Sequence, residues 1–93
     1  MSREPNVIYV GRKSAMSYVL AVVTAFTTSD TKEVNLKARG RAIITAVDAA
    51  EITRRKFMKD LDISKITIGT EEIPQEEGGT RMVSTIEITL SRK

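Results

Sequence analysis

Five cationic side chains stand at two places in the chain. They are Arg12 and Lys13, which follow a short apolar run, and Lys37, Arg39 and Arg41, which fall within the five residues KARGR. Guanidinium and ammonium groups form charge-assisted hydrogen bonds with anionic oxygens, above all those of phosphates. Gathering like charges costs electrostatic repulsion, and residues 11–13 and 37–41 contain no carboxylate to offset it. The pattern therefore predicts a polyanionic ligand.

The elements around these cations determine whether they meet. Asn6–Val10 is typical of a strand, Ala15 to about Thr28 of a helix capped by Ser14, and Glu33–Arg39 of a half-buried strand. A strand–helix–strand unit in one sheet is nearly always parallel and right-handed, so both strands end at the same edge. Neighbouring strands lie about 4.8 Å apart. We therefore expect the two groups of cations to share one edge of the sheet.

The spacing of the second group suits a nucleic-acid backbone. Lys37 and Arg39 alternate with apolar residues, so they point to the same side about 6.8 Å apart. This is close to two nucleotide steps of about 3.4 Å each. The backbone amides after Gly40, at the start of the next helix, offer a second type of phosphate contact. A tight turn alone accounts for Gly40 equally well.

The rest of the chain completes the order β-α-β-α-β-β. We expect a helix from Ala42 to about Lys59, a strand over Ile63–Gly69, a long hairpin loop over residues 70–80, and a strand over Met82–Ser91. The third strand should end on the same side as the first two, so the hairpin should project beside the cations like an arm. A length of 93 residues indicates one domain over residues 1–93.

Composition argues against most enzymes. The chain contains no Cys and no His, which removes disulfides, thiolate metal sites and the commonest general base. Asp48 and Glu51 lie three residues apart on the second helix, but pairing with Arg54 or Arg55 explains them more simply. We expect no metal and no cofactor. A nuclease would need a carboxylate cluster at the cationic edge, so catalysis is the last of the functions considered.

Charge is distributed unevenly along the chain. Residues 1–59 hold eleven Lys and Arg against five Asp and Glu, whereas residues 60–93 hold four against seven. This asymmetry predicts that one surface only meets a polyanion. The longest uncharged stretch, residues 14–29, is shorter than the about 20 apolar residues that a membrane span needs, and MSREPN has no apolar signal core. We therefore expect a cytoplasmic protein without a membrane partner.

Three stretches of the chain resemble a known family. NVIYVGRKSAMSYVLAV, KARGRAIITAVDAAEITRRKF and VSTIEITL, in this order, resemble the Alba family of small archaeal chromatin proteins. The resemblance implies an α+β two-layer sandwich with a mixed sheet and both helices on one face, like the C-terminal domain of translation initiation factor three. It also implies a homodimer, or a heterodimer with a paralogue, that binds double-stranded DNA and often RNA with little sequence preference and assembles further along DNA.

The resemblance also assigns roles to residues. Its nucleic-acid-binding positions match Asn6, Arg12, Lys13, Tyr18, Lys37, Arg39 and Arg41, to which we add Arg81 as the only cation of the hairpin arm, and its contact between neighbouring dimers matches Phe57. The residues alone leave two of these open, since Tyr18 is equally typical of a core and a phenylalanine such as Phe57 is more often found in one.

Three departures from the family pattern affect these expectations. Arg12 replaces the lysine that the family acetylates, so either Lys13 is the candidate for modification or the protein lacks this switch. Ser14 and Ser17 replace the usual proline and asparagine at the start of the first helix, a structurally mild change. The arm contains four glutamates (Glu71, Glu72, Glu76 and Glu77), which are poorly suited to lie against phosphates.

Two binding functions follow. The first is an architectural chromatin protein that coats or compacts DNA as a dimer through phosphate contacts and is associated with the chromosome. The alternative is an RNA-binding subunit of a ribonucleoprotein such as ribonuclease P. The chain has only four aromatic residues, and none forms a stacking pair at short spacing, which argues against sequence-specific recognition of single strands.

Overall fold

The computed structural model describes residues 6–93. Its elements are β1 (Val7–Tyr9), α1 (Ala15–Thr28), β2 (Glu33–Arg39), α2 (Ala42–Ile52), a π-helical turn (Thr53–Phe57), β3 (Leu61–Pro74) and β4 (Thr80–Arg92). The first five residues, on which the expected absence of a signal sequence partly rests, lie outside the described range. No helix within residues 6–93 has the length and apolar character needed to cross a membrane.

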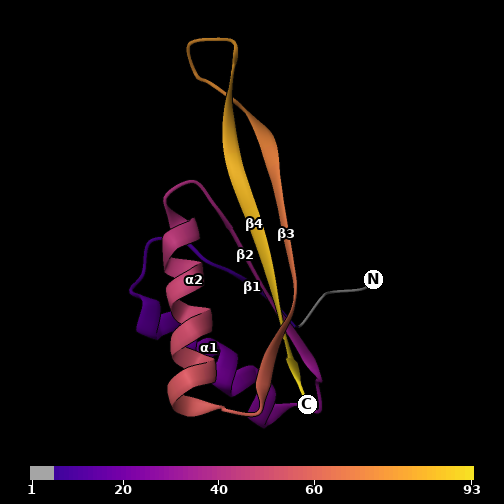
Figure 1. Ribbon diagram of the computed structural model, residues 1–93. Coiled ribbons are helices and arrows are strands. Elements are labelled where there is room, and N and C mark those ends of the chain that lie inside the picture. The colour runs from indigo at the N-terminus through magenta and orange to yellow at the C-terminus, as the bar shows by residue number, and fades with distance from the viewer. Residues whose placement is uncertain (1–5) are drawn as a thin grey trace.

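The four strands form one mixed sheet in the order β1-β2-β4-β3. Strand β1 is parallel to β2, and β4 is antiparallel to both of its neighbours, so β3 runs in the same direction as β2. Both helices cover one face of the sheet, and the β3–β4 hairpin extends well beyond them (Figure 1). The predicted α+β sandwich, with its β-α-β-α-β-β order, is confirmed.

The core lies between the helices and one face of the sheet. In β2, buried residues alternate with more exposed ones, as the period of a strand requires. Helix α2 contributes small side chains to the core, whereas α1 contributes larger ones. The core cluster includes Val19, Val22 and Phe26 of α1, Val34 and Leu36 of β2, Ala46, Ala49 and Ala50 of α2, and Ile88 and Leu90 of β4.

The β3–β4 hairpin is longer than the sequence predicts. Residues 70–80, expected as a loop, continue the ladder as far as the pair Pro74 and Thr80, and only Gln75–Gly79 form the turn. Gly78 and Gly79 have φ values of 94° and 75°, which only glycine adopts without strain. Proline and glutamates disfavour strands intrinsically, but pairing with β4 overrides that preference. We call residues 70–84 the arm, because beyond the pair of Arg39 with Thr85 neither strand has a third partner.

The second helix ends earlier than expected and changes its geometry. We predicted a helix to about Lys59, whereas α2 ends at Ile52 and is followed by the π-helical turn. The Met58 amide donates to the Thr53 carbonyl over 2.7 Å, which closes this wider turn. Thr53 is buried, and its hydroxyl donates to the Ala49 carbonyl over 2.7 Å. The turn ends at Phe57, whose side chain is 52% exposed.

Candidate nucleic-acid interface

Parallel pairing of β1 with β2 brings the two groups of cations to one edge of the sheet. Val7 pairs with Asn35 and Tyr9 with Lys37, so the residues that follow β1 lie beside the end of β2. The predicted convergence is therefore present in the fold. We call these five residues the basic edge: Arg12, Lys13, Lys37, Arg39 and Arg41. Lys37 is half-buried and the other four are exposed.

The hydroxyl group of Tyr18 holds the backbone of the loop after β1 in place. The tyrosine hydroxyl accepts hydrogen bonds from the backbone amides of Gly11, over 2.8 Å, and Lys13, over 3.2 Å. Its side chain is part of the core and only 8% exposed. Tyr18 therefore fixes the backbone of the loop, while the side chains of Arg12 and Lys13 extend into solvent. Direct contact of Tyr18 with a ligand stays a prediction.

The backbone conformation of the turn after β2 explains why residue 40 is a glycine. This residue has a φ of 59°, a left-handed conformation that glycine adopts at little cost. Its amide donates to the Ser84 carbonyl over 2.9 Å, which ties the turn to the base of the arm, so this amide is not free for a phosphate. The next residue, Arg41, stands at the N-cap of α2 with an exposed side chain.

Two carboxylates from other strands approach the basic edge. Glu71, in the arm, accepts a hydrogen bond from Arg39 over 2.5 Å and forms an ion pair with it. Glu87 of β4 lies directly across the sheet from Lys37 in the register of β2 with β4. Neither carboxylate was predicted at this edge, because both lie far from residues 37–41 along the chain. Residues 11–13 and 37–41 themselves contain no carboxylate, but in the folded chain Glu71 offsets part of their charge.

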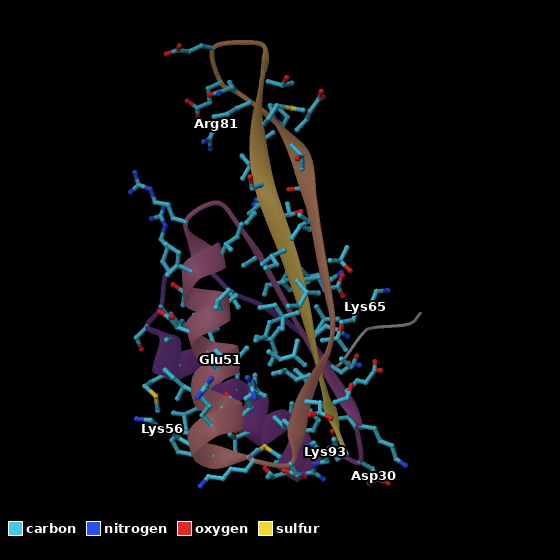
Figure 2. The ribbon with its side chains drawn as sticks, viewed as in Figure 1. Asp30, Glu51, Lys56, Lys65, Arg81 and Lys93 are labelled. Atoms are coloured by element: carbon cyan, nitrogen blue, oxygen red, sulfur yellow. The ribbon has the colours of Figure 1, made fainter. Side chains whose placement is uncertain are left out.

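Three of the predicted residues lie away from the basic edge. Asn6 precedes β1, at the opposite end of that strand from Arg12, and its carbonyl accepts a hydrogen bond from the Asn35 amide. Arg81 lies in the arm opposite Ile73, near the tip of the hairpin (Figure 2). Phe57 ends the π-helical turn. Their assigned roles stay predictions, and none of the three belongs to the basic edge.

The cations at the end of α2 have a partner of their own. Glu51 pairs with Arg55 over 2.8 Å and with Arg54 over 2.7 Å, and hydrogen bonds from these two guanidinium groups lower the pKa of its carboxyl. The predicted local pairing is confirmed for Glu51. Asp48 forms no ion pair within residues 6–93. No cluster of three potential metal ligands occurs within the same range.

Comparison with known proteins identifies the family. The family model described as Alba matches residues 6–70. The chain belongs to the Alba family. The DNA/RNA-binding protein Alba of Methanocella arvoryzae is 54% identical over 89 residues, which cover 96% of this chain and 92% of the relative. DNA/RNA-binding protein Alba 1 of Archaeoglobus fulgidus is 53% identical over 88 residues, which cover 95% of this chain and 97% of the relative.

A solved Alba structure has the same fold. Alba from Thermoplasma volcanium superposes with a TM-score of 0.87 at 50% identity, covering 94% of this chain and 100% of the other. The relatives' names describe binding to DNA and RNA and no catalytic activity. The basic edge therefore stands on an Alba fold whose named relatives bind nucleic acids.

Proposed function

We propose that this Alba protein binds double-stranded DNA without sequence preference and coats it as a dimer. The observation that carries the proposal is the convergence of five cations from two distant segments at one sheet edge. Phosphates of either strand satisfy such an edge irrespective of the base sequence. The same contacts suit duplex RNA, so we propose RNA as a second ligand. An architectural protein of this kind would be cytoplasmic and associated with the chromosome.

An uncovered apolar strip supports the dimer. Ile66 and Ile68 of β3 pair with Ile88 and Ile86 of β4, and so lie on the face of the sheet that the helices cover. The core covers only the start of β3, at Leu61 and Ile63, and the residues Ile66 and Ile68 further along are 56% and 77% exposed. Ile44 of α2 is exposed as well. Exposed apolar surface of this kind marks an interface, and a second copy supplies the same surface in return.

Phe57 suits a contact between neighbouring dimers on DNA. Its aromatic ring is half exposed although a core could accommodate it, and it stands at the end of the π-helical turn rather than on β3. The dimer contact and the contact between dimers would therefore use different elements of the fold. Lys13, with its side chain in solvent, remains the proposed site of acetylation, because Arg12 has no primary amine.

A salt titration tests the proposed function. A dimer that neutralises about 6–8 phosphates should give a slope of log K against log salt of about −5 to −7 on duplex DNA, because each phosphate contributes about −0.9. Binding is measured by fluorescence anisotropy over a range of salt concentrations. A slope shallower than about −2 would exclude the phosphate-coating function.

Competition between ligands separates the first function from its alternative. Duplex DNA, duplex RNA and a structured RNA are compared at one ionic strength, since affinities at different salt concentrations are not comparable. Equal affinity for the duplexes supports the architectural function. A strong preference for the structured RNA would favour a ribonucleoprotein subunit such as one of ribonuclease P.

Replacing Glu71 by glutamine is expected to strengthen binding. The carboxylate must leave Arg39 before a phosphate takes its place, and an exposed ion pair of this kind is worth about 0.2–1 kcal/mol. A dimer with two such pairs should gain about 2- to 30-fold in affinity at low salt. Anisotropy titrations on one duplex measure the gain.

Glu77→Gln is the matched control for this substitution. It removes the same charge from the hairpin turn, where Glu77 forms no ion pair within residues 6–93. An equal gain from both substitutions would show that net charge acts, and not the pair of Glu71 with Arg39.

A further inference from the structure

Tyr9 exposes an aromatic ring on the face of the sheet that no helix covers. Ile8 and Val10 pack into the core, and the alternation of a strand therefore turns Tyr9 to the opposite face. The side chain of Tyr9 is 73% exposed. Strand β1 is at the edge of the sheet, so the ring has β2 on one side only. A large aromatic surface in water gains nothing for the fold of a single chain.

The other aromatic residues have different positions. Tyr18 and Phe26 are buried in the core, at 8% and 1% exposure, and Phe57 follows α2. Tyr9 is therefore the only aromatic residue within residues 6–93 that stands on the open face. The apolar strip of β3 lies on the other face of the sheet, so a dimer through that strip leaves Tyr9 free.

Cationic side chains lie next to Tyr9, and the carboxylate of Glu87 lies one strand further away, across the sheet from Lys37. Lys37 is its direct neighbour across the strands, and Arg39 follows two residues further on the same face. Along β1, Arg12 comes three residues after Tyr9, in the loop that Tyr18 holds in place. A nucleotide whose base stacks on the Tyr9 ring would thus have cations within reach of its flanking phosphates. Stacking platforms joined to cationic tracks are the common device for unpaired bases.

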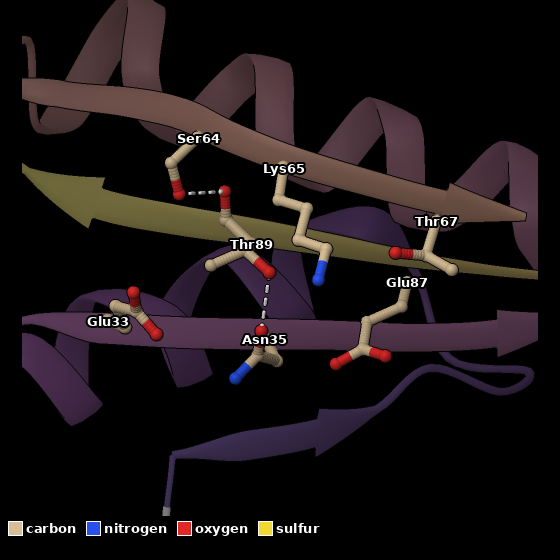
Figure 3. Close-up of a pocket in the computed structure, with 7 residues that line it drawn as sticks. All are labelled: Glu33, Asn35, Ser64, Lys65, Thr67, Glu87 and Thr89. Atoms are coloured by element: carbon tan, nitrogen blue, oxygen red, sulfur yellow. Dashed lines mark hydrogen bonds between the residues drawn. The ribbon is translucent and has the colours of Figure 1, made fainter.

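The open face also offers polar groups beside the ring. A shallow groove over β2, β4 and β3 is lined by side chains that include Asn35, Ser64 and Thr89. The Thr89 hydroxyl donates to Asn35 Oδ1 over 2.6 Å, and the Asn35 amide nitrogen is turned away from Thr89 towards β1 (Figure 3). Asn35 pairs with Val7, two residues before Tyr9. Its NH₂ group is a donor for a carbonyl oxygen at the edge of a base.

We propose that Tyr9 is a stacking site for one unpaired nucleobase, such as a bulged base or the first base beyond a duplex end. The base stacks on the phenol ring, and Lys37 and Arg12 hold its flanking phosphates. This site deepens the proposed function, on which it rests, because it adds a preference for irregular nucleic acids to general phosphate binding. A fully paired duplex does not occupy it, since its bases remain stacked on one another.

The test compares two duplexes of equal length and charge. One is fully paired, and the other carries a single unpaired 2-aminopurine, whose fluorescence falls on stacking. DNA and RNA versions of both distinguish the two sources of an unpaired base. Native protein should bind the bulged probe about 5- to 100-fold more tightly than the paired one, and should quench its fluorescence. Tyr9→Phe keeps the ring and the preference. Tyr9→Leu removes the preference but leaves affinity for the paired duplex unchanged.

Each outcome decides the proposal. Equal affinity of native protein for both probes, or a preference that persists in Tyr9→Leu, overturns the stacking site and leaves phosphate binding intact. Absence of binding to either probe overturns the proposed function together with the site. Circular dichroism of both variants establishes that the strand still folds. If Tyr9→Leu proves unfolded, Tyr9→Thr takes its place, because threonine favours strands and also lacks a ring, and it should lose the preference and the quenching.

Discussion

Replacing Lys37 and Arg39 together by alanine should weaken binding to duplex DNA about 10²- to 10³-fold at about 0.15 M salt. A dimer loses four cations by this change, all of them at the edge where β1 and β2 end. The slope of log K against log salt should become shallower by about 3 to 4, because each lost phosphate contact removes about 0.9. The loss should be equal for unrelated DNA sequences, since phosphates are the same in all of them.

The double variant Arg54→Ala with Arg55→Ala is the matched control. It also removes two cations from each chain, but these pair with Glu51 at the end of α2. We expect a loss of less than about 5-fold, from the smaller net charge alone. Equal losses in both double variants would mean that overall charge binds DNA and that the basic edge has no special role. A loss confined to one DNA sequence would indicate base readout in place of phosphate contact.

Replacing Ile66 and Ile68 by aspartate should convert the proposed dimer into monomers. In a two-fold interface each substitution occurs in both chains, so four isoleucine side chains are lost. The lost burial of apolar surface amounts to about 4–8 kcal/mol of binding free energy, which is enough to separate the chains at micromolar concentration. Sedimentation should then give the 10.3 kDa mass of one chain, against twice that mass for the native protein. The salt slope on duplex DNA should fall to about half, because one chain neutralises half as many phosphates.

Thr67→Asp provides the control for the interface. Thr67 lies between the two isoleucines on β3 but points to the other face of the sheet, towards the groove. An aspartate there adds charge to β3 without entering the apolar strip, and it should leave the dimer intact. A native protein that sediments as a monomer, or a dimer that persists in the isoleucine variant, would contradict the proposed interface.

Local sequence signals predicted the elements around the basic edge. The bounds of α1 and β2 agree with the prediction, because Ser14 precedes a run without breakers and residues 33–39 alternate strictly. The parallel strand–helix–strand rule then sufficed to bring the cations together. Element bounds and the position of the basic edge could therefore be predicted, because they depend on periodicity and on the order of the elements along the chain.

Features that depend on register could not be predicted in this way. Glu71 meets Arg39 only because β3 and β4 keep their pairing beyond the end of β2. The π-helical turn begins at Thr53, which is buried by the packing of the folded chain and not by its neighbours in sequence. The exposure of Tyr9 was not predicted because residues 7–10 are all apolar, so no alternation reveals which side chain leaves the core.

The ladder of the arm has a consequence for solubility. Beyond Thr85 both outer edges of this two-stranded ribbon present backbone amides and carbonyls without a neighbouring strand. Unpaired edges of this kind can form hydrogen bonds with a strand of another molecule, and charged side chains oppose such pairing. The glutamates at positions 71, 72, 76 and 77 give every arm the same sign of charge, so the arms of separate molecules repel one another. Acidic residues that are unsuited to phosphate contact thus protect the ribbon from aggregation.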